Sequence, residues 1–333
     1  MRKQKLTNLT PYAPGGVVIL TCPLGPTYEK LKFNLLGGLL ASQIDLIVGK
    51  INGKPFFTVK GADLLAENLY LSKSNPTNLI LLDFTLPNAK SSSAGGRPTS
   101  QAAEMLLTCL PSSTMQSLTF EISVNASAPA VGTGGIECYS QESDPTNNPF
   151  VMKQLYAQYN FQVAQDNDIA LPVGPSGGII SQLFFHQTNY GAPWAASTAY
   201  AVGAQVTNGG NLYKATAAGT SASSGGPSGT STSITDGGVT WTYVSAAGSV
   251  TNVQVRNAGV IIFEGKPSDI QGDQTDYGRV QQPGLLVLDY HLQGLREKLL
   301  NTSKSNQVFV RLTTTGGPTV WTGYTRLIDP AGR

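Results

Sequence analysis

The sequence has 333 residues, a formal net charge of +2 and 13% charged residues, well below the roughly 25% of ordinary soluble domains. This length is enough for two domains with their own cores, and the near-neutral charge excludes a broad basic surface for nucleic acid. Glycine, proline, serine and threonine are abundant and long amphipathic helices are scarce, which is typical of an all-β protein with many turns.

The chain begins with a short basic cluster, Arg2, Lys3 and Lys5. We expect it to be a solvated terminus, or a contact with nucleic acid or an anionic lipid surface. The apolar run at 17–20 is too short for the core of a signal peptide, and no later run approaches the ~20 apolar residues of a membrane span. The three cysteines lie far apart in the sequence, which predicts buried thiols in a reducing compartment and no disulfide framework.

Short alternating or apolar runs predict a first unit of eight strands. The dipeptide Asn52-Gly53 predicts a tight hairpin, and the spacing of apolar residues in 61–71 predicts a helix. The strands are expected at 17–22, 28–36, 43–50, 55–60, 78–86, 104–110, 117–125 and 154–164. Eight short strands with long connections favour a two-sheet sandwich of the jelly-roll type.

A second unit repeats the first. The segment "NLILLDFTL" at 78–86 matches "GLLVLDYHL" at 284–292 with an offset of 206, and this register holds without a gap back to residue 44. A later block, 110–124, matches 300–314 with an offset of 190, so the loop 87–101 of the first unit carries extra residues. The repeat predicts two tandem eight-stranded jelly rolls.

The front of each unit matches at an offset near 150, which leaves about 55 extra residues in the second unit. We therefore expect a first jelly roll at 1–165, a second at 166–191 and 248–333, and a small inserted β-domain at 192–247. The insertion would project outward from the surface of the second roll. Its two ends would emerge side by side at that surface, because the roll then stays intact.

No catalytic or metal site is expected. The only histidines are His186 and His291, and the residue that matches His291 in the first unit is Thr85. Asp83 and Asp289 recur at the same place in both units, which favours a role in the fold over acid–base chemistry. A further group, Asp269, Asp273 and Asp276, lacks the pattern of a calcium loop and is expected to be a solvated acidic turn. No cofactor is expected.

The two repeated units resemble the double-jelly-roll major capsid proteins of icosahedral bacteriophages, including corticoviruses and related single-stranded-DNA phages. The features that carry the resemblance are "LLDFTL" and "LVLDYHL", "KPFFTVKGADLL" and "IIFEGKPSDIQ", and "NQVFVRLTT". The resemblance implies a virion protein, assembled in the host bacterial cytoplasm, that forms homotrimers. It implies neighbouring capsomers, penton and minor capsid proteins as partners, and an internal membrane or the genome as the partner of Arg2, Lys3 and Lys5.

The insertion resembles the small chitin-binding-like β-modules of bacterial chitinases and phage surface proteins. It shares with them Trp194, a Tyr-x-x-Gly at Tyr200, "GGNLYKA" and the closing "DGGVTW". The candidate glycan-binding residues are Trp194, Tyr200, Tyr243, Asn208 and Asn211, because flat rings stack on sugars and amides bind hydroxyls. Trp241 and Tyr213 are expected in the module's core. A module without any ligand is the alternative.

The second hypothesis is a secreted carbohydrate-binding β-protein or a glycan-active enzyme that carries this module. The absence of a signal-peptide pattern and of paired carboxylates disfavours it.

Overall fold

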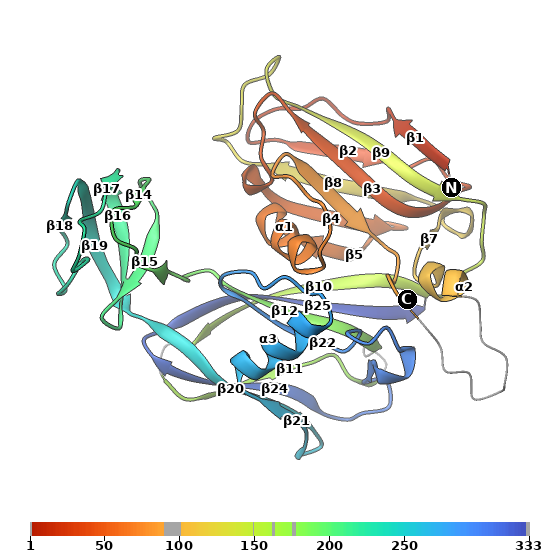
Figure 1. The fold of residues 1–333 in the computed structure, drawn as a ribbon. Helices are drawn as coiled ribbons and strands as arrows, with labels where there is room; N and C mark the ends of the chain where they lie inside the picture. Colours follow the sequence, from red (N-terminus) through yellow and green to blue (C-terminus); the bar gives the residue numbers. More distant parts are fainter. Residues whose placement is uncertain (1, 90–100, 149, 162–163, 175–177, 331–333) are drawn as a thin grey trace.

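The computed structural model describes residues 2–89, 101–148, 150–161, 164–174 and 178–330. It consists of two β-rolls side by side and a smaller β-domain that projects from one end of the second roll (Figure 1). The fold class is confirmed as two tandem jelly rolls with an inserted β-domain. Residues 90–100, where the sequence predicts the longer loop of the first unit, lie outside the described residues.

The first roll has two sheets, ordered β1-β9-β3-β6, with β7 beside β3, and β2-β8-β4-β5. Strand β8 shows why they face each other, since Leu118, Phe120 and Ile122 are buried and the residues between them are less so. The elements are β1 (Arg2–Leu6), β2 (Val17–Thr21), β3 (Thr27–Leu36), η1 (Ala41–Gln43), β4 (Ile44–Ile51), β5 (Lys54–Val59), α1 (Gly61–Tyr70), β6 (Leu79–Asp83), α2 (Gln101–Leu106), β7 (Leu110–Pro111), η2 (Ser112–Thr114), β8 (Leu118–Val124) and β9 (Gly135–Ser143).

The second roll repeats this plan strand for strand, with sheets β10-β25-β12-β22, with β23 beside β12, and β11-β24-β20-β21. Its helix α3 occupies the place of α1. The elements are β10 (Phe150–Phe161), β11 (Asp166–Ala170), β12 (Ile179–Gln187), β20 (Gly248–Asn257), β21 (Val260–Gly265), α3 (Pro267–Asp276), β22 (Leu285–Asp289), η4 (Arg296–Lys298), β23 (Leu300–Asn301), β24 (Val308–Gly316) and β25 (Thr319–Pro330).

The two rolls also share three β-bulges. The pairing of β3 with β9 shifts at Glu29, and that of β12 with β25 shifts at Ser181. The pairings of β4 with β8 and β20 with β24 shift at Asp45 and Thr251. The third pair of bulges, at Phe56 and Ile262, follows the hairpin turns 52–53 and 258–259, where both residues of each turn have positive φ.

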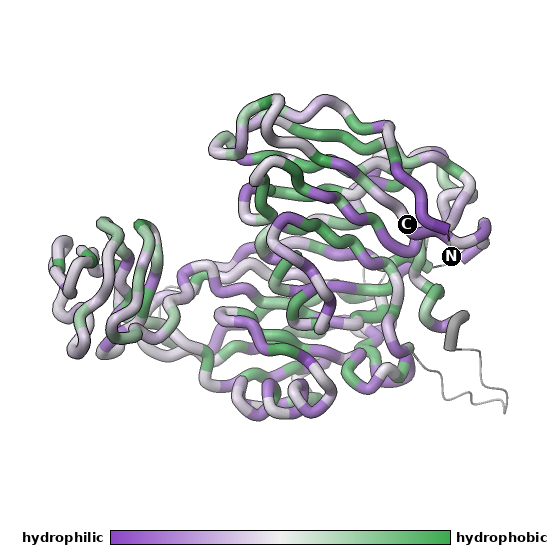
Figure 2. The backbone as a smooth tube through the Cα atoms, turned by 45° about the horizontal axis from the view of Figure 1, so that its top comes forward, coloured by the Kyte–Doolittle hydropathy of each residue, from purple (hydrophilic) through white to green (hydrophobic). Residues whose placement is uncertain are grey.

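The rolls are joined by hydrogen bonding as well as by packing. Edge strand β5 of the first roll meets β10 of the second through a parallel bridge between Phe57 and Gln154, so one nine-stranded sheet crosses the junction. The core of the first roll also takes in Phe184 and Tyr324 from the second. Figure 2 shows hydrophobic colour along the strands of both rolls and a hydrophilic β1 at their edge.

Several sequence predictions need correction. The run 104–110, predicted as a strand, is the end of helix α2 followed by the two-residue β7, because a short apolar run does not distinguish helix from strand. The strand predicted at 154–164 spans 150–161 and opens the second roll instead of closing the first. Since β10 holds the place that β1 holds in its own sheet, the rolls change between β9 and β10, ahead of residue 165.

Strands β1 and β9 were not predicted, because neither carries an apolar stripe. In β1 only Leu6 is buried, and the buried side chains of β9 are Cys138, Ser140 and Glu142. The Ser140 hydroxyl donates to Glu142 at 2.6 Å, so a polar pair fills part of this inner face. The three cysteines are buried and free, as expected, and burial raises the pKa of each thiol.

The insertion forms two small sheets, β13-β15-β16-β19-β18 and β14-β17, which pair with no strand of the rolls in the part of the chain that the structure describes. It leaves after β12 and returns at β20, a connection that in the first roll is only residues 37–43. Its strands are β13 (Ala192–Pro193), β14 (Ala199–Tyr200), β15 (Gln205–Asn208), β16 (Asn211–Ala217), β17 (Gly219–Thr220), β18 (Ile234–Asp236) and β19 (Val239–Ala246).

Candidate functional site

A buried polar network lies where helix α1 of the first roll packs against the sheet β10-β25-β12-β22 of the second roll. The Arg326 guanidinium on β25 donates to Glu67 of α1 at 2.7 Å and stands 4.8 Å from the ring centre of Phe184. It also donates to Gln154 of β10 at 3.0 Å and to Gln182 of β12 at 3.0 Å. Glu67 is fully buried and accepts further bonds from Gln154 Nε2. Such a pair is tolerated because its donors and acceptors are satisfied.

Other contacts of α1 complete the junction. Tyr324 donates its hydroxyl to Asp63 at 2.6 Å, and the ring of Tyr70 meets Phe184 edge-on at 6.1 Å. His186 lies between the two carboxylates of α1, with its ring nitrogens 3.7 Å from Asp63 and 3.7 Å from Glu67. This histidine of the second roll therefore contacts both carboxylates of a helix of the first roll.

Asp83 and Asp289 have the same role in the two rolls. Asp83 at the end of β6 pairs with Lys73 at 2.9 Å and Lys30 at 3.1 Å, and Asp289 pairs with Arg279 at 2.9 Å. Each carboxylate also accepts the backbone N–H two residues on. Burial alone would raise the pKa of Asp83, but the two lysines outweigh burial and hold it at about 2. Burial lowers the pKa of Lys73 in turn, and Asp83 offsets part of that.

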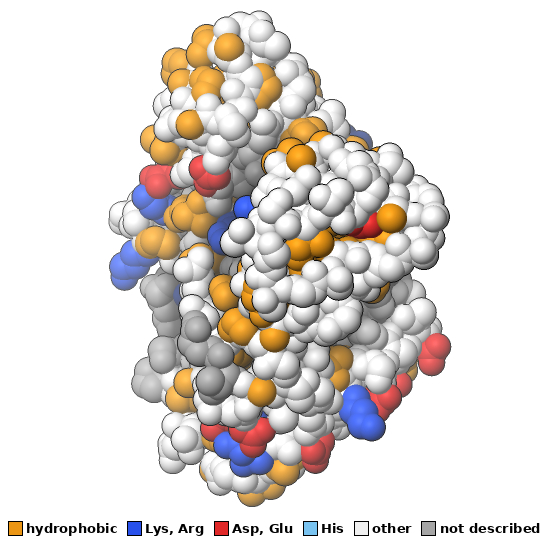
Figure 3. Space-filling view, turned by 90° about the vertical axis from the view of Figure 1, so that its left-hand side faces the viewer, with side chains coloured by type: hydrophobic (Ala, Val, Ile, Leu, Met, Phe, Trp, Pro, Cys, Tyr) orange, Lys and Arg blue, Asp and Glu red, His pale blue; other side chains and the backbone are white. Residues whose placement is uncertain are grey.

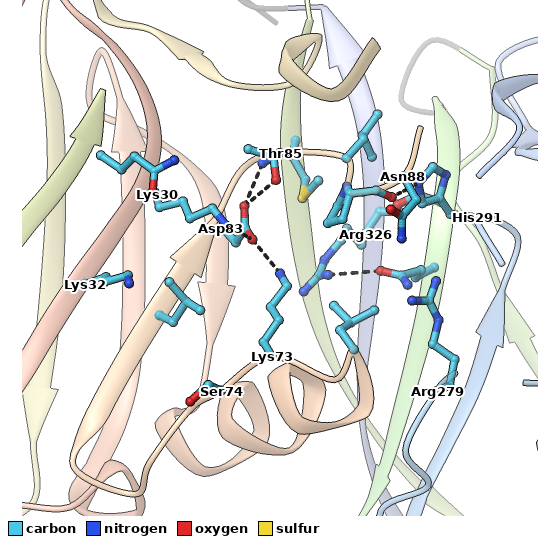
Figure 4. A pocket seen from close by; sticks show the side chains of 18 residues that line it. Lys30, Lys32, Lys73, Ser74, Asp83, Thr85, Asn88, Arg279, His291 and Arg326 are labelled. Atoms are coloured by element: carbon cyan, nitrogen blue, oxygen red, sulfur yellow. Dashed lines mark hydrogen bonds and ion pairs between the residues drawn. The ribbon is translucent and has the colours of Figure 1, made fainter. Parts of the chain in front are cut away.

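A cavity of about 370 Å³ lies at this junction, and basic side chains from both rolls line it (Figure 4). Lys30, Lys32 and Lys73 come from the first roll, and Arg279 and Arg326 come from the second. His291 also lines it, with Nε2 at 3.0 Å from the Pro87 carbonyl, and burial lowers the pKa of this ring. Four of the five cations face carboxylates: three of these ion pairs lie within one roll, and the fourth, Arg326–Glu67, joins the two rolls.

The described residues include no cluster of three or more His, Cys, Asp or Glu side chains placed to hold a metal ion. Within those ranges, no helix is long and apolar enough to cross a membrane. The three aspartates of the expected acidic turn lie on helix α3 instead, and all three are exposed.

The basic N-terminal residues form the edge strand β1 instead of a free end. Lys5 pairs with Glu137 at 2.6 Å, and Arg2 lies 3.5 Å from Glu142. Lys3 is exposed and forms no ion pair within the described ranges. The structure thus places all three residues on the outer edge of the first roll.

In the insertion, Asp236 binds two of the tryptophans. Its carboxylate accepts the indole N–H of Trp194 at 2.8 Å and of Trp241 at 3.0 Å, and the backbone N–H of Ala222 at 3.0 Å. Trp241 is fully buried, as is Tyr213, which agrees with the core role expected for both. The "DGGVTW" motif therefore stabilises the interior of the module through Asp236 and Trp241.

The five candidate glycan residues fall into separate groups with internal contacts. Trp194 and Asn208 border a cleft of about 900 Å³ between the insertion and the second roll, and Asn208 donates to the carbonyls of Gly225 and Pro227. Tyr200 lies edge-on to the ring of Trp241. Asn211 donates to the Tyr213 hydroxyl, and that ring meets Tyr243 edge-on.

The surface of the insertion is nearly uncharged. Figure 3 views the molecule from the insertion's side, and few charged side chains appear on it. Between residues 191 and 255 the Asp, Glu, Lys, Arg and His residues are only Lys214 and Asp236, and Asp236 is buried.

The most instructive residues that sequence reasoning missed are Lys73 and Arg279, and Glu67 and Arg326. The first pair carried a signal, because the offset of 206 that matches Asp83 with Asp289 also matches Lys73 with Arg279. The second pair carried none, since Glu67 and Arg326 come from different units.

Comparisons with known proteins agree with this architecture. The viral coat protein P2 N-terminal domain model matches residues 3–142, and the viral coat protein P2 C-terminal domain model matches residues 235–322. Together the two models cover more than half of the chain. No curated protein matches it by sequence.

Solved structures with the same fold come from several viruses. The major capsid protein P2 from bacteriophage PM2 is 13% identical, with a TM-score of 0.71 over 99% of this chain and 98% of that chain. The major capsid protein of Sulfolobus turreted icosahedral virus is 10% identical, with a TM-score of 0.59 over 97% and 95%. The PBCV-1 virus capsid structure is 11% identical, with a TM-score of 0.56 over 98% and 92%. The chain therefore belongs to the viral coat protein P2 family and is a structural, non-enzymatic protein of the virion.

Proposed function

We propose that this coat protein is the major capsid protein of an icosahedral bacteriophage and that it forms homotrimers which tile the shell. The observation that carries the proposal is the repeated strand order, β1-β9-β3-β6 and β10-β25-β12-β22 in one pair of sheets and β2-β8-β4-β5 and β11-β24-β20-β21 in the other. Two similar rolls in each chain give a trimer six similar lobes. A threefold particle of that shape fills a hexagonal lattice.

Neighbouring trimers, and penton and minor capsid proteins at the vertices, are the partners that such a shell requires. The test is the mass of the purified protein in solution and the shape of assembled particles. Sedimentation should give three chains of 35.0 kDa per particle, and electron microscopy of the trimer should show six lobes. A stable monomer or dimer, with no shells at high concentration, would contradict the proposal.

We further propose that the insertion lies on the outer face of the shell and contributes to attachment to host-surface glycans. In Figure 1 it stands at one end of the rolls, away from the end where β1 begins and β25 finishes. Its polar, almost uncharged surface and the cleft bordered by Trp194 and Asn208 support a neutral ligand such as a sugar. Many weak sites on one particle would act together.

Replacement of residues 192–247 by a short Gly/Ser bridge tests this second proposal. The backbone carbonyl of Gly248 accepts from the Gln187 side chain at 3.2 Å, so the ends of β12 and β20 are already close together. We expect trimers that still assemble and bind less to host cells or to glycan arrays. Unchanged binding would refute the attachment role, and a protein that fails to fold would show that the insertion belongs to the core.

A further inference from the structure

Helix α1 contacts the second roll of its own chain, and its repeat, helix α3, has no matching contact with the first roll within the described residues. Glu67 of helix α1 contacts Gln154 of β10, Arg326 of β25 and His186 of β12. Its repeat α3 presents exposed Asp269, Asp273 and Asp276, none of which forms an ion pair within the described ranges. The face that corresponds to β10, β25 and β12 in the first roll is that of β1, β9 and β3. In Figure 1, β1 and β21 lie at opposite ends of the molecule.

The strand registers define which residues correspond. Because both sheets carry the same bulge, Lys30 opposite Gln141 matches Gln182 opposite Arg326. Lys3 opposite Gln141 likewise matches Gln154 opposite Arg326.

The same registers match two further places on this face. Lys32 opposite Tyr139 corresponds to Phe184 opposite Tyr324. Lys5, which is also opposite Tyr139, corresponds to Tyr156.

The helices correspond through the offset of 206. Asp273 takes the place of Glu67, Asp269 that of Asp63, and Asp276 that of Tyr70. The match holds in three dimensions. Asn68 of α1 donates to the Leu81 carbonyl, and Gln274 of α3 donates to the carbonyl of Val287, which is 206 residues further on.

If α3 contacts β1, β9 and β3 of another chain as α1 contacts β10, β25 and β12 of its own chain, opposite charges come together. Glu67 meets Arg326, Gln154 and Gln182 within the chain, so Asp273 would meet Gln141, Lys3 and Lys30. Tyr70 meets Phe184, so Asp276 would meet Lys32. In both contacts the carboxylates lie on the helix and the cations lie on the sheet. Within the chain the cation is Arg326 on β25, whereas in the contact between chains the cations are lysines on β1 and β3.

Asp269 completes this pattern beside a fourth lysine, Lys5. Asp63 accepts from Tyr324, so Asp269 would accept from Tyr139. Lys5 stands directly over the Tyr139 ring, at 5.8 Å. The basic face and the acidic helix are thus complementary at three separate positions.

Exposure of apolar side chains points to the same surface. Phe56 and Phe57 of β5 are each 3% exposed, whereas their counterparts Ile262 and Phe263 of β21 are 49% and 37% exposed. Strand β5 lies along β10, and the free edge of β21 has no strand beside it within the described ranges. A patch of this kind on an edge strand needs a cover.

We propose that α3 and β21 of one subunit dock on β1, β9 and β3 of the next, so that the contact between the rolls of one chain is repeated between chains. The inference rests on the proposed trimer and adds its interface. The contact is head-to-tail, and three such contacts close a ring of six rolls. Lys3, Lys5 and Lys32 then bind a second copy of this chain, and β1 is not available to a membrane or a genome.

Charge reversal in the full-length protein tests the interface. The double variant Asp273→Lys/Asp276→Lys should raise the dissociation constant of the trimer about a hundredfold, since close charge pairs across an interface are each worth about tenfold or more. Addition of Lys3→Asp and Lys32→Asp to the same chain should restore the trimer, because every interface then carries the exchanged pairs. Sedimentation velocity over a dilution series measures both. Lys214→Asp on the insertion is the matched control and should leave the trimer unchanged.

The outcomes separate the two claims. A wild-type protein that is not a trimer overturns the proposed assembly, and this interface with it. A wild-type trimer that is unaffected by the aspartate reversal overturns the interface alone. Circular dichroism of each variant distinguishes loss of assembly from loss of folding, and failure of the four-residue exchange to restore the trimer, in a protein that is folded, also refutes the pairing.

Discussion

Substitution of Arg326 by methionine should be one of the most damaging single changes at the inter-roll junction. The guanidinium donates to Gln154, Gln182 and Glu67, and methionine keeps much of its volume but donates nothing. Among the described residues, the fully buried Glu67 would keep only the Gln154 amide and the more distant His186 as partners. Removal of one member of a buried ion pair costs about 3–5 kcal/mol.

Urea unfolding at a fixed protein concentration, followed by circular dichroism, measures this loss. With a slope of about 3 kcal/mol/M, the midpoint should fall by about 1 M or more. The double variant Arg326→Met/Glu67→Met should recover most of the loss, since no charge is then left buried. Arg311→Met is the matched control, because Arg311 pairs with Asp168 and Asp166 at a solvent-accessible site. Equal midpoints for Arg326→Met and Arg311→Met would refute the reasoning.

Four further variants test single positions. Asp83→Asn should lower the free energy of unfolding by roughly 2 kcal/mol above pH ~4. Because the pKa of Asp83 is held at about 2, this contribution disappears as the pH falls toward 2. A difference in stability between variant and wild type that stays constant during acid unfolding would contradict this reasoning. Asp236→Ala should open the insertion alone, seen as protease cleavage within 192–247 while the rolls stay folded, because three donors lose their acceptor. Gly272→Ala in α3 should raise the free energy of unfolding by about 1 kcal/mol, since nothing lies within 4 Å of the added methyl. Gly61→Ala should lower the free energy of unfolding by about 1–3 kcal/mol, because the added methyl would lie 2.3 Å from the Ala41 carbonyl oxygen. Thermal unfolding of the two glycine variants checks that one is more stable and the other less stable than the wild type.

Much of the fold could be predicted from local pattern, because the two rolls repeat the same strands at a constant offset. Strands β4, β5 and β6 and helix α1 recur 206 residues later as β20, β21, β22 and α3. Strands β1 and β9 were missed because the buried side of β9 consists of small and polar residues, which give no apolar alternation.

The candidate site was less predictable. The Glu67–Arg326 pair spans 259 positions, so no local pattern relates its members. Trp194 illustrates a second limit, because a sequence shows that an aromatic residue is present and does not show whether its N–H already has an acceptor. Here Asp236 provides that acceptor from 42 residues away.

The three bulges that the rolls share record how the chain arose. A bulge is one extra residue in one strand, and it can enter a sheet at many places. Both rolls carry theirs at the same three places, although the residues there differ: Glu29 and Ser181, Asp45 and Thr251, Phe56 and Ile262. Bulges at matching places therefore support the interpretation that the two rolls are copies of one roll that already carried these irregularities.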